Sequence, residues 1–109
     1  TLLRQIDSLY AAKAYQQTLD SIESFRLRFP KNVEGRSHAL EVWQKASLDM
    51  TRQQVGLTDS ALQATGRQLE MARSHYDRNM LSVKRDSLQV RYDALCGTVR
   101  VIHKRQAED

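Results

Sequence analysis

The chain has 109 residues, which fits one domain, and its 17 Lys and Arg against 13 Asp and Glu give a formal net charge of +4. Charged residues interrupt every apolar run, as Arg52, Asp59 and Arg67 do in the middle of the chain, and this excludes a transmembrane helix. The single cysteine, Cys96, excludes an intrachain disulfide. A short chain drawn out into long helices buries little of itself, so we expect apolar surface to be shared between helices or subunits.

Two short amphipathic helices are predicted in residues 1–31. The first carries its apolar residues on one face and the second repeats the spacing: Leu2, Ile6, Leu9 and Tyr10, then Tyr15, Leu19, Ile22, Phe25 and Phe29. The boundary between them is poorly defined, because residues 12–14 contain no turn residue. The second helix should end near Phe29, since the residue before Pro30 is disfavoured in helical conformation.

A long helix is predicted over residues 32–79, with Asn32 as its N-cap and Glu34 in its first turn. Two apolar stripes run along it: Ala39, Trp43, Ala46, Met50, Leu57, Ala61, Ala64 and Met71 on one, and Leu48, Val55, Leu62, Leu69 and Tyr76 on the other. Gly56 and Gly66 disfavour a helix interior, so the alternative is a break near Gly56. Otherwise the chain is expected to reverse at the polar residues 77–79.

A last helix is predicted over residues 80–106. Its apolar residues follow the spacing of a coiled-coil seam, with one seven-residue step and then alternating four- and three-residue steps: Leu81, Leu88, Tyr92, Leu95, Val99 and Ile102. Folded back antiparallel, this helix would cover the distal half of the long one, and the first two helices would cover the proximal half. The seam fits an intramolecular hairpin and an intermolecular coiled coil equally well. The predicted fold is therefore all-α, a single elongated domain with a coiled-coil hairpin.

Residues 2–30 resemble one tetratricopeptide unit, in which Tyr15 opens the second helix and Pro30 closes it. Three positions depart from the family pattern. Lys13 stands where the family usually has glycine, Thr18 where it has alanine, and Phe25 where it has a small residue. One unit forms neither a solenoid nor its concave groove.

The chain as a whole resembles a group of uncharacterised helical proteins of Bacteroidales, tetratricopeptide-like and exported or lipid-anchored. The resemblance is carried by residues 15–30, 58–63, 84–93 and 102–105. It implies a periplasmic or membrane-anchored location in the cell envelope, with a cytoplasmic location as the alternative, and no known catalytic or binding residues. Because the chain opens at Thr1 without methionine, we expect an upstream segment, through which alone any membrane anchoring would come.

The sequence offers no catalytic, cofactor or metal site. His38, His75 and His103 are isolated, and no spacing of histidines, cysteines or carboxylates suits a metal. Cys96 has no base beside it and lies next to the seam, so an inert, partly buried thiol is expected. Paired carboxylates and glycine-rich phosphate loops are absent as well. We therefore expect a protein without enzymatic activity.

An interaction surface is the remaining candidate. Residues 73–105 hold eight basic and three acidic residues, and the candidate surface comprises Tyr76, Arg78, Lys84, Arg85, Arg91, Arg100, Lys104 and Arg105. The other tyrosines and Trp43 have spacings typical of core residues. The sequence favours a helical scaffold or adaptor that binds a protein partner or a second copy of itself. The alternative is a small basic nucleic-acid-binding protein that uses the C-terminal helix, although no base-stacking aromatics are interleaved with the basic residues.

Overall fold

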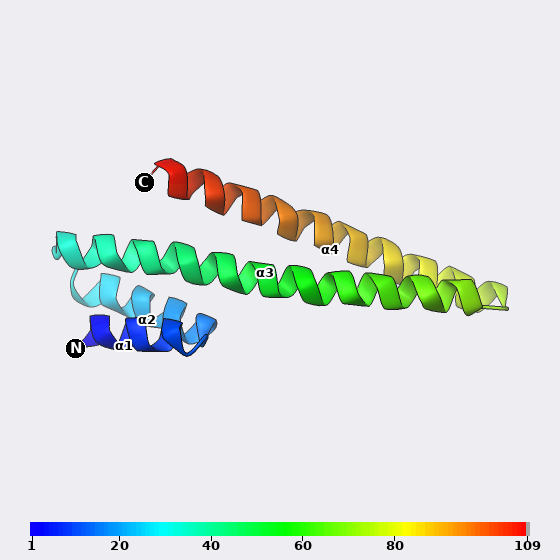
Figure 1. The fold of residues 1–109 in the computed structure, drawn as a ribbon, viewed down its shortest axis with the longest axis horizontal. Helices are drawn as coiled ribbons and strands as arrows, with labels where there is room; N and C mark the ends of the chain where they lie inside the picture. The colour runs from blue at the N-terminus through cyan, green and yellow to red at the C-terminus, as the bar shows by residue number, and fades with distance from the viewer. Residues whose placement is uncertain (109) are drawn as a thin grey trace. The chain divides into compact units, whose positions relative to one another are not determined.

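The computed structural model describes residues 1–108, and this part of the chain is all-α, as predicted. Its four helices are α1 (Leu2–Ala11), α2 (Tyr15–Arg28), α3 (Val33–Met71) and α4 (His75–Glu108) (Figure 1). The chain forms two compact units. The first unit contains residues 1–50 together with the chain from Ile102 onward, and the second contains Thr51–Val101. Helices α3 and α4 each contribute to both units.

The link between α1 and α2 is a helix C-cap in which Lys13 takes the left-handed conformation, with φ 61°. The N–H of Lys13 donates to the carbonyl of Tyr10 at 2.9 Å, and that of Ala14 donates to the carbonyl of Leu9 at 3.0 Å. These two bonds make a Schellman motif, which satisfies the last carbonyls of α1. The motif separates the helices although residues 12–14 contain neither glycine nor proline.

The start of α3 is fixed by Asn32, as the sequence predicted. Its side-chain oxygen accepts the N–H of Gly35 at 2.9 Å. Gly35 is buried, and a Cβ atom there would lie 2.5 Å from the Phe25 ring and 2.8 Å from the Asn32 amide nitrogen. The missing side chain therefore lets α2 approach the first turn of α3.

The core of the first unit lies between α1, α2 and the first half of α3, so the first two helices cover the proximal part of α3 as expected. Its buried cluster consists of Ile6, Ile22, Phe25, Ala39 and Val42, with Leu2, Leu3, Tyr10 and Trp43 packed against it. Two polar contacts join α1 to α3: the Tyr10 hydroxyl donates to Asp49 Oδ2 at 2.7 Å, and His38 Nε2 lies 2.7 Å from Asp7 Oδ1.

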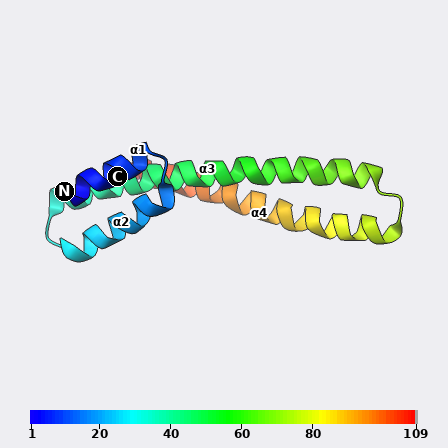
Figure 2. The same ribbon diagram turned by 90° about the horizontal axis from the view of Figure 1, so that it is seen from below.

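In the second unit, the second half of α3 and α4 up to Val101 lie side by side and run in opposite directions (Figure 2). Buried threonines recur every seven residues on this part of α3, at Thr51, Thr58 and Thr65. Half-buried residues accompany them on α3 and α4: Val55, Leu62, Leu69, Leu81, Leu88, Tyr92, Leu95 and Val99. Leu57 and Met71, which the sequence placed on the first apolar stripe, are exposed.

Two predicted boundaries are wrong. Helix α3 ends at Met71 instead of Asn79, and α4 begins at His75 instead of residue 80. The reversal falls at residues 72–74 because the Ser74 hydroxyl caps α4, accepting the N–H of Asp77 at 3.0 Å. Arg78 Nε donates to the carbonyl of Ala72 at 3.1 Å, so the polar residues predicted to form the turn are the first turn of α4. The alternative break near Gly56 is also wrong, since α3 is continuous through it.

Lys13→Gly is expected to stabilise the protein by about 0.5–1 kcal/mol, because glycine adopts the left-handed conformation without steric cost. Ala12→Gly is the matched control: Ala12 has φ −80°, so glycine there only adds freedom to the unfolded chain and lowers stability. Urea denaturation measures both variants. Equal losses of stability would contradict the role of the Lys13 conformation.

The three α3 glycines should respond to alanine with opposite signs. Gly35→Ala places a methyl group against Phe25 and Asn32 and should cost about 1–3 kcal/mol. Gly56→Ala and Gly66→Ala meet no atom within 4 Å and should each stabilise the helix by about 0.5–1 kcal/mol. Thermal and urea unfolding monitored by circular dichroism would test the set. A harmless Gly35→Ala would show that α2 does not approach α3 this closely.

Stability should fall with pH above 10 because of Tyr10. The hydrogen bond to Asp49, with burial and the Asp49 charge, raises the pKa of Tyr10 from 10.0 to about 12. Between these values the unfolded chain loses the Tyr10 proton while the folded protein keeps it, so rising pH favours unfolding. Urea unfolding across this range should show a decline that Tyr10→Phe reduces and Tyr76→Phe, at an exposed position, leaves in place.

Candidate interaction surface

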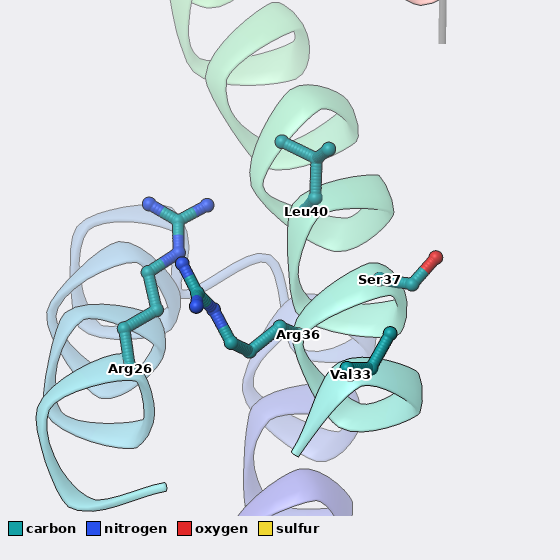
Figure 3. A pocket seen from close by; sticks show the side chains of 5 residues that line it. All are labelled: Arg26, Val33, Arg36, Ser37 and Leu40. Carbon is teal, nitrogen blue, oxygen red and sulfur yellow. The ribbon is translucent and has the colours of Figure 1, made fainter. Parts of the chain in front are cut away.

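A shallow depression lies on the first unit between α2 and the start of α3. It has a volume of about 470 Å³ and is lined by Arg26, Val33, Arg36, Ser37 and Leu40. Arg26 comes from the last turns of α2, and the other four come from the first two turns of α3. Figure 3 shows both arginine side chains reaching into the space between the two helices. The close packing of Phe25 on Gly35 positions these two helix segments.

The two guanidinium groups of the depression are held in place by uncharged groups. Arg26 is half-buried and its guanidinium carbon lies 5.1 Å from the centre of the Trp43 ring. Arg36 Nη1 donates to the carbonyl of Pro30 at 2.9 Å. Within residues 1–108 neither arginine forms an ion pair with a carboxylate. Two positive charges therefore stand at this surface uncompensated.

Exposed apolar side chains stand beside these charges. Val33 is 78% exposed and Leu40 is 38% exposed. With Ser37 they occupy positions i, i+4 and i+7 of α3, which lie on one face of a helix. Leu40 and Ser37 also line a second depression of about 490 Å³, together with Glu41, Gln44, Lys45 and Gln106. The first depression thus combines exposed apolar side chains with positive charge, whereas the lining of the second is mainly polar.

The structure does not bring the predicted surface residues together. All eight lie exposed on α4, where they are spread from Tyr76 to Arg105 over most of the helix. Arg78 is engaged at the turn with Ala72, and Arg85 Nε lies 3.6 Å from Asp86 Oδ1. At about 100° per residue, Lys84 and Arg91 fall on a different side of the helix from Arg85. The basic residues of α4 form no continuous stripe.

Sequence reasoning missed the depression because its residues lie outside the apolar stripes. Val33 precedes the first apolar stripe, Leu40 lies between its residues Ala39 and Trp43 without belonging to it, and Arg26 belongs to a helix that the sequence describes only as amphipathic. One signal was available. Arg36 has no acidic residue three or four positions away in either direction, so no partner exists for it along its own helix.

Neither a candidate metal site nor a helix that could span a membrane is found among the described residues. No three His, Cys, Asp or Glu residues in this part of the chain are placed to hold a metal ion. None of its helices combines the length and apolarity needed to cross a bilayer. Cys96 is half-buried. The charge of its thiolate and a hydrogen bond between the two side chains raise the pKa of Tyr92. This Tyr92–Cys96 pair lies one turn apart on α4.

Comparisons of the chain with models of protein families, with curated proteins and with solved structures give no match.

Proposed function

We propose that the protein is a non-enzymatic helical scaffold or adaptor that binds another protein. The observation that carries this proposal is the surface around Arg26 and Arg36, where two guanidinium groups without a carboxylate partner border the exposed Val33 and Leu40. The partner that fits is an amphipathic helix whose apolar side chains are flanked by Asp or Glu. Apolar contacts and charge pairs would then form at the same place.

The geometry of the face suits such a helix. Val33 and Leu40 are seven residues apart, which is about 10 Å along α3 and two turns of a partner helix. Partner helices commonly use apolar anchors at i, i+4 and i+7. Guanidinium groups bind carboxylates through paired hydrogen bonds, and charges at the rim of an interface select the partner and speed its association.

We further propose that the first unit is tetratricopeptide-like. The left-handed Lys13 supports this, because it adopts a glycine conformation at the position where the resemblance predicts glycine. Phe25 replaces a small residue of the pattern, and the Gly35 position on α3 leaves room for its ring. The large residue Phe25 on α2 thus packs on Gly35 of α3, which has no side chain, and the two helices stay closely packed.

We also propose that the second unit is a coiled-coil hairpin. The half-buried residues of α4 recur at three- and four-residue steps, and α3 carries its own repeat every seven residues in the opposite direction. A location in the cell envelope is proposed on the resemblance alone.

Nucleic-acid binding through α4 is less well supported. Its basic residues are divided between two sides of the helix and alternate with Asp77, Asp86 and Asp93. A protein that neutralises several phosphates needs its cations along one groove-facing surface.

The proposed adaptor function predicts that the protein prefers peptides with acidic flanking residues. Selection from a library of displayed peptides can test this preference. Displayed peptides would keep apolar residues at i, i+4 and i+7 and carry Asp, Glu, Lys, Arg or Gln at the flanking positions. Selection on the wild-type protein should enrich Asp and Glu. Binding of a selected peptide would be titrated by the fluorescence of Trp43, the only tryptophan, which contacts Arg26.

The double variant Arg26→Glu, Arg36→Glu should weaken binding of this peptide by about 10–100-fold, since each reversed charge pair is expected to cost about 0.7–1.4 kcal/mol. The same variant should enrich basic peptides instead. Arg67→Glu, Arg73→Glu is the control, because both arginines are exposed in the second unit. Selection without acidic enrichment, or equal affinity for all three proteins, would refute the proposed function.

A further inference from the structure

Helix α4 carries a second apolar face that its own unit leaves exposed. Its large apolar residues Tyr76, Met80, Val83, Val90 and Val101 are 52–72% exposed. With small residues between them they form a run of alternating four- and three-residue steps, here called the outer seam: Tyr76, Met80, Val83, Ser87, Val90, Ala94, Gly97 and Val101. All eight belong to the second unit.

Most of the outer seam is separate from the contact that α4 makes with α3, although Met80 lines a depression with Met71 of α3 and Gly97 is half-buried. Leu81, Leu88 and Leu95 are half-buried, whereas Val83 and Val90, two residues further along, are exposed. Two residues correspond to about 200° of rotation, so the two apolar faces point in nearly opposite directions. A helix that packs on one neighbour needs one apolar face. The other face is thus available to a further helix.

The length and period of the outer seam fit a coiled coil. Its eight positions span 26 residues, and apolar a/d repeats sustained over about three to four heptads are typical of coiled coils. The small residues Ser87, Ala94 and Gly97 permit a close approach of the partner helix. The seam would be contacted along its whole length only by a helix of the same repeat.

The charges along its two edges identify that helix as a second copy. One edge carries Asp77, Lys84 and Arg91, and the other carries Asp86, Asp93 and Arg100, so the middle of one edge is basic and the middle of the other is acidic. In a parallel, in-register pair, each edge of one helix meets the other edge of its partner. Asp86 then faces Arg91 of the second copy, and the symmetry repeats this pair. Asn79 meets Lys84 and Asp93 meets Thr98, which are not charge pairs, and at the end of the seam the like-charged Arg100 and Arg105 meet.

The antiparallel pairing is disfavoured by the same charges. With full overlap of the two seams, Asp86 would face Asp93 of the second copy, and Lys84 would face Arg91. Both contacts place like charges together, and the symmetry doubles each of them. Like-charged flanking residues destabilise helix pairs and direct the choice of partner.

We propose that the outer seam is a homodimer interface at which two copies pair in parallel and in register. The interface goes beyond the proposed partner binding, because it uses the second unit and neither Arg26 nor Arg36. A dimer would display two copies of the partner surface in one assembly, which raises avidity for a partner that has two sites.

Sedimentation equilibrium of the full chain with reductant, at about 0.15 M salt, tests the dimer. Wild type should be dimeric. Val90→Asp should raise the dimer dissociation constant by about 100-fold or more, because each copy would bury an unpaired carboxylate. Leu57→Asp is the matched control: Leu57 is 69% and Val90 70% exposed, both in the second unit, but Leu57 lies on α3. Circular dichroism should show unchanged helix content in both variants.

Charge reversal tests the orientation. Asp86→Arg and Arg91→Asp should each weaken a parallel dimer by about tenfold, and the double variant should restore it. An antiparallel dimer would respond with the opposite sign, since each single change replaces a like-charged contact by an opposite one. A mixture of the two single variants should form a parallel heterodimer in preference to either homodimer.

Crosslinking gives an independent readout. In a Cys96→Ser background, Met80→Cys should form a disulfide-linked dimer on oxidation, because equivalent positions of a parallel pair lie within disulfide reach. An antiparallel pair would separate these sites by about 25 Å and would crosslink only Met80→Cys with Gly97→Cys. A monomeric wild type, a dimer indifferent to Val90→Asp, or the antiparallel crosslink would overturn the proposal. Acidic peptide selection at Arg26 and Arg36 would be unaffected by any of these results.

Discussion

The contact between the Phe25 ring and the backbone at Gly35 is the constraint on which the first unit depends. Phe25 brings the largest side chain of the buried cluster, and it reaches α3 only where a side chain is missing. Asn32, three residues before Gly35, caps the start of α3. The same short segment therefore fixes both the first turn of α3 and the place where α2 approaches it. The Arg26–Arg36 depression is a direct result, because these arginines belong to the same two helix segments. A bulky residue at position 35 would therefore disturb both the core and the candidate surface.

The two halves of the long helix α3 have different neighbours. Its first half enters a core made by two short helices, where Ala39 and Val42 are buried. Its second half has only α4 beside it, and its buried residues there are threonines. A two-helix layer covers one face of each member, so Leu57 on α3 and the outer seam on α4 stay at the surface. Exposed apolar surface in this protein follows from the number of neighbours available to each segment.

Much of the fold could be predicted from local patterns. Proline and asparagine mark the α2–α3 boundary by well-understood chemistry, and the helical period is clear in every segment. The α3–α4 boundary was misplaced although Ser74 and Asp77 have the spacing of a capping box. The polar residues 77–79 that follow are equally typical of a turn. The Lys13 cap has no local signal, because lysine is not a residue that favours the left-handed conformation it adopts.

The surface residues were harder to predict, for a physical reason. A periodic pattern shows which residues share a helix face, but whether that face meets a neighbour depends on tertiary structure. The seam of α4 that faces α3 and the outer seam have similar periods, and only the structure tells which one is covered. The basic residues of α4 stood out by their number. Arg26 and Arg36 come from different helices, and only the fold brings them together.

The buried threonines of the second unit give the α3–α4 contact a distinct mechanical character. The hydroxyls of Thr58 and Thr65 donate to the carbonyls of Gln54 and Ala61, four residues back on the same helix, at 2.8 Å. Each of these two hydroxyls therefore has its hydrogen-bond partner on its own helix. The threonines are buried beside half-buried leucines, and the hydrogen bonds of these two hydroxyls lie within α3. Such a surface resists separation yet allows small sliding shear, the motion by which packed helices carry a displacement along their length.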